Sequence, residues 1–306
     1  MRPELTRASD LLRDQSPESV AEAIGLLQEV VFSFSMKMCG HRQDAEDTSQ
    51  EVLYRSLKYL PKLQEPSALA AWLYTVTRNR CHRLRSVAAD SPMRKLSLDE
   101  LMPGETELSR LLLDAGKSPE GKLLQKEKVQ FLHKALLKIP NQLRLVLVLH
   151  DMEELGTDLV AQILNLQVGT VRVRLHRARL ALRKEIAQIV QGRRPSASAS
   201  PKRRQLSRKT HEGGRRPKEC RELFASLSEY LDGRVGSETC DHMSAHIARC
   251  PACVAFLRDL REAIARCKSM EAPCDRAVTS RLQALLTSEY LRLIGRASSS
   301  EVVAEA

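Results

Sequence analysis

The sequence predicts an all-α protein made of small helical units joined by linkers. Its 306 residues are rich in Leu, Ala, Arg and Glu, whereas aromatic residues make up only 4% and Gly and Pro number 13 each. This composition favours helices over turn-rich sheets. Apolar residues recur at intervals of three and four along most of the chain, and no strand-like alternation persists. The length fits two or three domains of common size.

Breaks in the apolar pattern divide the chain into segments. A polar, patternless start is followed by helices predicted over 20–38, 43–60 and 67–86, the first ending at Gly40 and the second at Pro61. Further helices are predicted over 123–138, 141–151, 157–189 and 275–294. The predicted segments are an N-terminal extension (1–24), a helical bundle (25–88), a linker (89–122), a second helical unit (123–190), a basic linker (191–218), a Cys/His-rich unit (219–270) and a last helix with a tail (271–306).

Several classes of protein are excluded by what the sequence lacks. No apolar run approaches the length that spans a bilayer, and the N-terminus has no signal-peptide core, so we expect a cytoplasmic protein without a membrane partner. Its eight Cys then predict reduced thiols or metal ligands, not a disulfide framework. The sequence has no P-loop, dinucleotide fingerprint or nucleophile elbow, and we expect no enzymatic activity.

Positive charge is concentrated in one linker. The net charge is +11, and the stretch from Arg193 to Lys218 holds ten Lys or Arg with one acid, Glu212. The overall charge is therefore weak evidence for nucleic-acid binding. A solvated, extended tether is the simpler interpretation, and a non-specific contact with phosphates is the functional one.

The pattern over 157–184 predicts a helix-turn-helix. Thr157 is placed to cap a short helix, a turn follows at 165–167, and a second helix opens at Val168. On the second helix, a predicted buried stripe comprises Val171, Leu175, Ala178 and Leu182. The opposite face carries Gly169, Thr170, Val173, His176 and Arg177, flanked by Arg172, Arg174, Arg179, Arg183 and Lys184. Such a helix can enter a major groove, although a solvated surface helix would show the same cations.

This unit resembles region 4 of the extracytoplasmic-function (ECF) bacterial sigma factors, through the runs 139–149 and 168–179. In that family the second helix reads the −35 promoter element. The resemblance implies DNA binding by Thr170, Arg172, Val173, Arg174, His176 and Arg177. Members of the family often have Ser where Val173 stands, so an apolar contact, for example with a thymine methyl group, replaces a hydroxyl contact and changes the expected sequence preference.

Region 2 of the same family is expected earlier in the chain, and residues 44–52 and 70–80 resemble its two characteristic helices. The first of these helices docks on the clamp of core RNA polymerase in the family. The resemblance implies polymerase binding by Asp44, Asp47, Gln50, Glu51 and Tyr54. The residues alone also allow two other interpretations. The acidic face could simply be solvated, or Asp44, Glu46 and Asp47 could bind a divalent metal. The metal site is disfavoured, because residues i and i+2 point in different directions on a helix.

The second region 2 helix combines aromatic residues with cations, which suits strand separation and an unstacked base. In the family this helix and the loop before it read the −10 element. The implied DNA-binding residues are Trp72, Arg78, Asn79, Arg80, His82 and Arg83. Asn79 is the best candidate for a base contact, whereas Trp72 fits a core position better than a DNA contact. The preceding loop, 62–69, has few cations and contains Pro66, unlike common family loops.

The Cys/His-rich unit has the spacing of a metal site. His246 and Cys250 lie one helical turn apart, and Pro251 breaks the helix so that Cys253 returns to the same point. A tetrahedral zinc needs a fourth ligand, and the candidates are Cys220, Cys240, His242 and Cys267. Residues 220–253 resemble the zinc-binding anti-sigma domain, and this resemblance implies Cys220. Zinc could be a staple for a small unit, a sensing site, or both.

The remaining thiols of this part are Cys240, Cys267 and Cys274. They are either buried small residues or candidate redox groups, which could form a disulfide and expel zinc or bind a softer metal such as copper or cadmium. The last helix carries an apolar stripe that could clamp the two sigma regions or pack within its own domain. That stripe comprises Val278, Leu282, Leu285, Leu286 and Tyr290.

Taken together, these features predict a sigma factor with its own zinc-dependent regulatory domain. Its expected partners are core RNA polymerase and promoter DNA, with a contact in cis between the C-terminal domain and the sigma regions. The alternatives are a helix-turn-helix regulator that does not bind polymerase and a metalloenzyme. A closed four-ligand zinc argues against the metalloenzyme, because catalytic zinc keeps a position open.

Overall fold

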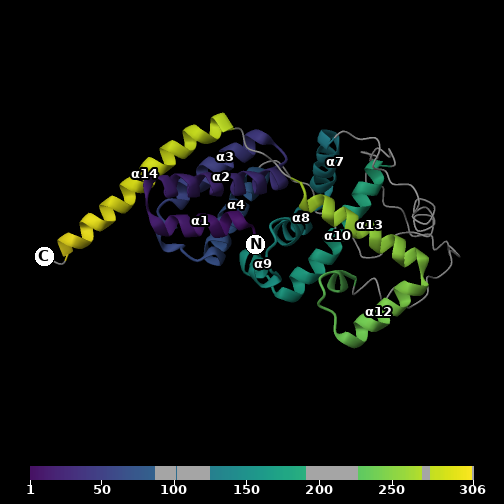
Figure 1. The fold of residues 1–306 in the computed structure, drawn as a ribbon. Helices are drawn as coiled ribbons and strands as arrows, with labels where there is room; N and C mark the ends of the chain where they lie inside the picture. Colours follow the sequence, from purple (N-terminus) through teal and green to yellow (C-terminus); the bar gives the residue numbers. More distant parts are fainter. Residues whose placement is uncertain (87–100, 102–124, 191–226, 271–275, 305–306) are drawn as a thin grey trace.

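The computed structural model describes residues 1–86, 101, 125–190, 227–270 and 276–304. Within these ranges every regular element is a helix, as the sequence predicts. We name three parts: the first unit (residues 1–86), the second unit (residues 125–190) and the C-terminal part (residues 227–304). Figure 1 shows the first unit and the second unit side by side, with helices of the C-terminal part lying against both.

The first unit contains α1 (Pro3–Asp14), α2 (Pro17–Cys39), α3 (Arg42–Ser56), a 3₁₀ turn (Leu60–Lys62) and α4 (Pro66–Ser86). The local sequence explains the bounds of α2. Ser16 caps its start by accepting a hydrogen bond from the Ser19 amide, and Pro17 occupies the first helical position. Gly40 ends it with φ of 81°, a conformation that favours glycine.

The beginning of the chain differs from the expected unpatterned extension. Residues 3–14 form α1, which packs along α2 and buries Leu5, Ala8 and Leu12. Their spacing of three and four is a helical signal, masked by the polar residues between them. Arg13 also donates to the Gln64 carbonyl at 2.9 Å, so α1 restrains the loop before α4.

The second unit contains α7 (Gln125–Lys138), α8 (Asn141–Leu147), a π-helical turn (Val148–Met152), α9 (Thr157–Leu164) and α10 (Val168–Val190). The predicted helix-turn-helix is confirmed as α9 and α10. Asn165 adopts a left-handed conformation at the end of α9, with φ of 51°, which turns the chain sharply. The predicted stripe of α10, from Val171 to Leu182, is buried at all four positions.

The C-terminal part contains α12 (Ser237–Arg249), α13 (Pro251–Lys268) and α14 (Arg276–Ala304). Helix α13 packs on α10, whereas α14 lies along α2 and contacts α3 (Figure 1). Helix α14 is longer than the predicted 275–294. The C-terminal part therefore contacts both of the other units.

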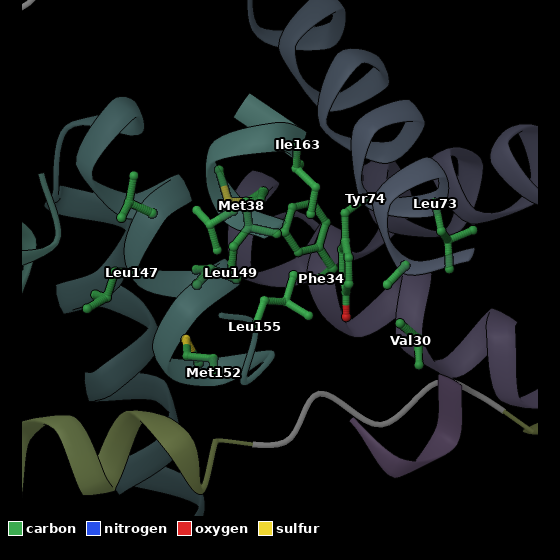
Figure 2. Packing of buried hydrophobic residues seen from close by; sticks show 14 of the residues in the cluster. Val30, Phe34, Met38, Leu73, Tyr74, Leu147, Leu149, Met152, Leu155 and Ile163 are labelled. Atoms are coloured by element: carbon green, nitrogen blue, oxygen red, sulfur yellow. The ribbon is translucent and has the colours of Figure 1, made fainter. Parts of the chain in front are cut away.

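The two helical units share one hydrophobic core in this conformation. Figure 2 shows where they meet: Phe34 and Tyr74 of the first unit face Leu149, Leu155 and other apolar residues of the second unit. The Phe34 and Tyr74 rings pack edge to face, with centroids 5.1 Å apart. Helix α2 is apolar and long enough to cross a membrane by length and composition, but most of its apolar stretch is buried in this core.

Candidate functional site

The N-terminal half of α10 presents the predicted DNA-reading face. Thr170, Arg172, Val173 and Arg177 are exposed, and Arg174 is half-buried. Within the described part of the chain, the side chains of Arg172 and Arg177 form no hydrogen bond or ion pair. This surface is therefore open for phosphate and base contacts of the kind that the sequence predicts.

His176 differs from the prediction, because only 8% of it is exposed. Its Nε2 atom is buried without a hydrogen-bond partner among the described residues. Burial, together with the charges of Arg179 and Arg177, lowers the pKa of His176 to about 4. His176 is thus a neutral, inward-facing group in this conformation, and the exposed face is narrower than a helical projection indicates.

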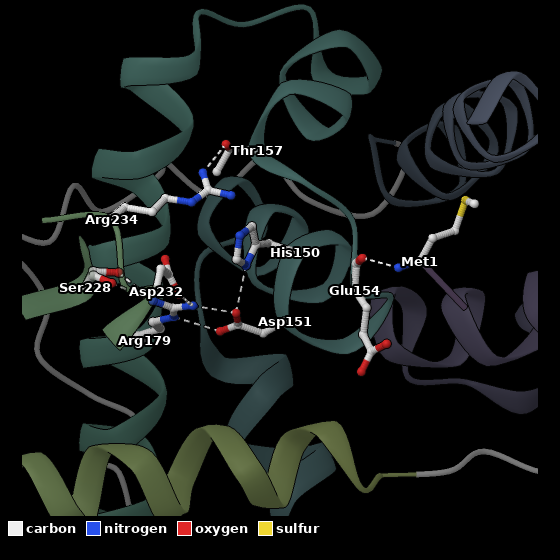
Figure 3. Close-up of polar contacts among 9 residues, drawn as sticks. All are labelled: Met1, His150, Asp151, Glu154, Thr157, Arg179, Ser228, Asp232 and Arg234. Carbon is white, nitrogen blue, oxygen red and sulfur yellow. Dashed lines mark hydrogen bonds and ion pairs between the residues drawn. The ribbon is translucent and has the colours of Figure 1, made fainter. Parts of the chain in front are cut away.

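Arg179, predicted to flank the DNA-reading face, points inward and joins the second unit to the C-terminal part (Figure 3). Its Nε and Nη2 atoms lie 2.8 and 2.7 Å from the two carboxylate oxygens of Asp151. The same guanidinium donates to Asp232 at 2.7 Å and to the Ser228 hydroxyl at 2.7 Å, both in the C-terminal part. Burial opposes the ionisation of Asp151, but hydrogen bonds from Arg179 and His150 outweigh it and lower the pKa of Asp151 to about 2.

Two further contacts extend this junction. Arg183, also predicted to flank the DNA-reading face, is 1% exposed, and its Nε lies 2.7 Å from Asp259 of α13. Its guanidinium carbon lies 4.4 Å from the centre of the Phe256 ring, a cation–π contact. Arg234 donates to the Thr157 hydroxyl at the start of α9 at 2.5 Å (Figure 3). The C-terminal half of α10 is therefore covered, whereas its N-terminal half is open.

The predicted polymerase-binding face of α3 lies beside α14. Four of its five residues, Asp47, Gln50, Glu51 and Tyr54, line one side of a hollow of about 730 Å³. The opposite side is formed by α14, through Leu282, Leu285, Leu286, Ser288, Glu289 and Arg292. The fifth residue, Asp44, is half-buried and lies outside this hollow. Of the alternative metal ligands on α3, Glu46 is paired with Arg42 at 2.9 Å.

A glycine of α2 faces the side chain of Gln283 on α14. The Gln283 side chain donates to the Ala21 carbonyl at 2.5 Å. A Cβ atom on Gly25 would lie 2.9 Å from the same side-chain nitrogen. Gly25 therefore leaves room for the end of the Gln283 side chain, and a larger side chain at this position would displace that end and its hydrogen bond to Ala21.

A second hollow, of about 460 Å³, is lined in part by residues of α4 that the sequence predicts to contact the −10 element. Trp72, Asn79 and Arg80 line it. Sequence reasoning missed three other lining residues, Arg55, Lys58 and Tyr59, which follow the acidic face at the end of α3. The Tyr59 and Trp72 rings lie 5.2 Å apart, which places Trp72 at the wall of this hollow and half-buried. An aromatic wall with nearby cations suits an unstacked base.

The other predicted −10 residues are placed differently. Arg78 does not line the hollow; its Nη1 atom donates to the Ile163 carbonyl of the second unit at 2.7 Å. Arg80 is paired with Glu51 at 2.6 Å, so the polymerase-binding face and the hollow share a charged pair. The side chains of His82 and Arg83 lie outside the described residues.

The predicted metal ligands His246, Cys250 and Cys253 come together where α12 ends and α13 begins. Their ligand atoms lie within 4.8 Å of one another. His246 Nε2 and Cys253 Sγ are 3.5 Å apart, close to the edge of about 3.6 Å that a tetrahedron with ordinary Zn–N and Zn–S bonds requires. The donor set and its geometry therefore fit zinc.

Among the described residues, no fourth His, Cys, Asp or Glu joins these three donors. In the part of the chain described, Cys240, His242 and Cys267 do not join the three gathered donors. Cys220, the ligand that the resemblance implies, and Cys274 lie outside it. Burial raises the pKa of the Cys267 thiol to about 12, with a further upward contribution from Asp151. A protonated, buried thiol is a poor redox group.

Comparisons with known proteins match three stretches of the chain to known families. The model of Sigma-70 region 2 matches residues 24–89, that of Sigma-70 region 4 matches 132–182, and a model described as "Putative zinc-finger" matches 220–253. The chain is 28% identical over 176 residues to the ECF RNA polymerase sigma factor SigW of Bacillus subtilis, covering 56% of this chain and 91% of the relative. It is 26% identical over 166 residues to the RNA polymerase sigma-H factor of Pseudomonas aeruginosa, covering 53% and 83%.

Proposed function

We propose that this chain, an ECF-type sigma factor with a C-terminal anti-sigma-like zinc-finger domain, is inhibited in cis by that domain. The chain directs promoter recognition through regions 2 and 4, which correspond to the first and second units. We further propose that it acts in the cytoplasm as a subunit of RNA polymerase and performs no chemistry of its own.

The observation that carries the proposal is the position of α14. It lies along α2 and lines, together with α3, the hollow that contains four predicted polymerase-binding residues. A polymerase helix that docks on Asp47, Gln50 and Tyr54 would meet α14 in the same place. Displacement of α14 is therefore required before this face is accessible over its whole width.

The contact of α13 with α10 of region 4 also supports inhibition in cis. Arg179 and Arg183 hold the C-terminal part on region 4 through Asp232 and Asp259. Because α14 follows α13 in the same chain, a domain fixed on region 4 keeps α14 at a high local concentration beside region 2.

Zinc would contribute to this inhibition as a structural cross-link. His246, Cys250 and Cys253, with Cys220 as the fourth ligand, would hold it, and the bound ion would fix the junction of α12 and α13. That junction positions the helix that carries Phe256 and Asp259. Loss of the metal would therefore weaken the contact with region 4.

The test compares core-polymerase binding and promoter transcription by the full chain and by a 1–190 truncation. We expect tighter binding and higher transcription without the C-terminal part. Equal values for the two proteins, with or without zinc and under reducing or oxidising conditions, would overturn inhibition in cis. Failure of both proteins to bind core polymerase would instead favour a helix-turn-helix regulator.

A point variant tests α14 in the full chain. Gly25→Leu places a side chain where Gln283 lies and should increase polymerase binding. Gly295→Leu is the matched control, because nothing lies within 4 Å of a Cβ at Gly295. An equal effect of the two variants would contradict a role for α14 docking.

A further inference from the structure

A single buried carboxylate joins region 4 to region 2. Glu153 follows the π-helical turn of region 4 and is fully buried. Its Oε1 atom lies 2.8 Å from Lys37 Nζ of α2, and its Oε2 atom accepts a hydrogen bond from the Tyr74 hydroxyl of α4 at 2.8 Å. Arg2, just before α1, places its Nε 2.7 Å from the same Oε2. All three donors belong to the first unit, and Lys37 and Tyr74 lie within region 2.

Burial of these side chains disfavours any partly opened state of the contact. Lys37 and Tyr74 are each 1% exposed. Burial lowers the pKa of Lys37, and the charge of Glu153 acts in the opposite direction and favours the ammonium form. Removing one partner of such a pair leaves the other charge buried without compensation. The pair is therefore stable either closed and dry or fully separated in water.

The hydrogen bonds and ion pairs of Glu153 are all made with the first unit, and from the C-terminal part Cys267 of α13 lies near enough to influence Lys37. Arg78 donates to the Ile163 carbonyl, the Phe34 and Tyr74 rings pack against each other, and the terminal amine of Met1 donates to the Glu154 carbonyl (Figures 2 and 3). The closed arrangement of the two sigma regions thus has an interface of its own, beneath the helices that cover it.

Promoter geometry shows why this interface must open. Elements centred near −35 and −10 lie about 25 base pairs apart, or about 85 Å at the rise of duplex DNA. Helices α4 and α9 are in direct contact here. The two regions can therefore reach both elements only after they have separated.

We propose that Glu153 is an interdomain latch, which holds region 2 against region 4 and sets the cost of opening the sigma factor. This inference rests on the proposed function, because the latch matters only if the two regions act on one promoter. It adds a second layer of regulation: displacing the C-terminal part exposes the polymerase-binding face, whereas releasing Glu153 separates the promoter-reading regions.

The experiment uses the full chain and three variants. Glu153→Gln removes the charge with little change in shape, Tyr74→Phe removes one donor, and Glu154→Gln is the control, since Glu154 is the exposed neighbour. Backbone hydrogen exchange at α4 and α9 is measured with core-polymerase affinity, and far-UV circular dichroism confirms that the helices remain. We expect at least tenfold faster exchange at these two helices and several-fold tighter polymerase binding for Glu153→Gln, with smaller effects of Tyr74→Phe.

Two outcomes would overturn the latch: exchange in Glu153→Gln equal to that in Glu154→Gln, or faster exchange that spreads over every helix of the chain, which indicates general unfolding. The latch hypothesis and the hypothesis of inhibition in cis can be disproved independently. Gly25→Leu should tighten polymerase binding without faster exchange at α4 and α9. A response to Glu153→Gln without a response to Gly25→Leu would support the latch and contradict inhibition by α14.

Discussion

Region 4 and region 2 differ in how much of their predicted working surface is open. On region 4, Arg172, Val173 and Arg177 are exposed, so the −35 face is accessible in the closed chain. On region 2, α14 lies beside the polymerase-binding face, and Arg78 is engaged by region 4. Under the proposed function, the closed conformation would block polymerase engagement and promoter opening but not contact with the −35 element.

Removal of zinc should have the largest effect on stability, and this effect should be limited to the C-terminal part that covers region 2. Structural zinc in small units contributes roughly 10–16 kcal/mol of apparent binding free energy, which is also folding free energy. We expect the double variant His246→Ala and Cys253→Ala to unfold residues 227–270, while regions 2 and 4 keep their helices. Hydrogen exchange by segment measures this.

The control for the zinc experiment is Cys240→Ala, because Cys240 does not join the three gathered donors. Bound zinc should stay at one ion per chain in this control and fall to none in the double variant. Retention of slow exchange over α12 and α13 without zinc would show that packing on α10 suffices to hold the C-terminal part.

A core substitution tests whether the two sigma regions are coupled in stability. Phe34 is fully buried where they meet, and Phe34→Ala should cost about 3–5 kcal/mol. Because the core is shared, both regions should lose stability in one transition, measured by calorimetry. Two separate transitions, with only region 2 shifted, would mean that the regions are independent.

Whether the sequence predicts a feature depends on how far apart in the chain its residues lie. The stripe of α10 and the metal trio depend on spacings within one or two turns, and the sequence predicts both. The pairing of Glu153 with Lys37 joins residues 116 positions apart, and no local pattern encodes it. Arg179 and Arg183 were predicted to flank the DNA-reading face, because a helical projection cannot show that Asp232 and Asp259 approach them.

The burial of His176 predicts a pH dependence of stability that originates in region 4. Its pKa is about 4 when folded and near its ordinary value of 6.5 when unfolded, so the unfolded state binds more protons between these values. Stability should therefore fall as the pH decreases from 6.5 towards 4, by up to about 3 kcal/mol. Denaturant unfolding at several pH values measures the loss.

The matched variant for this dependence is His176→Gln, which cannot titrate. The difference in unfolding free energy between the wild type and this variant should change with pH in the stated window and be constant above pH 7. A constant difference at all pH values would show that His176 is solvated, and the DNA-reading face would then be as wide as the sequence predicts.

The smallest expected effect concerns the open face itself. Arg172→Ala should weaken binding to a −35 duplex by about 1–3 kcal/mol, the range for one lost base contact. If Arg172 binds a phosphate instead, the loss should be the same for every sequence and the salt slope should fall by about 1. His176→Ala should change the affinity less than twofold, since its ring is turned inward. Fluorescence anisotropy with the full chain and a 1–190 truncation measures whether the −35 face is open or covered.

If the −35 face is open, the loss of affinity caused by Arg172→Ala is the same in both proteins. If the C-terminal part also covers this face, only the truncated protein loses affinity, and the contrast between region 4 and region 2 disappears.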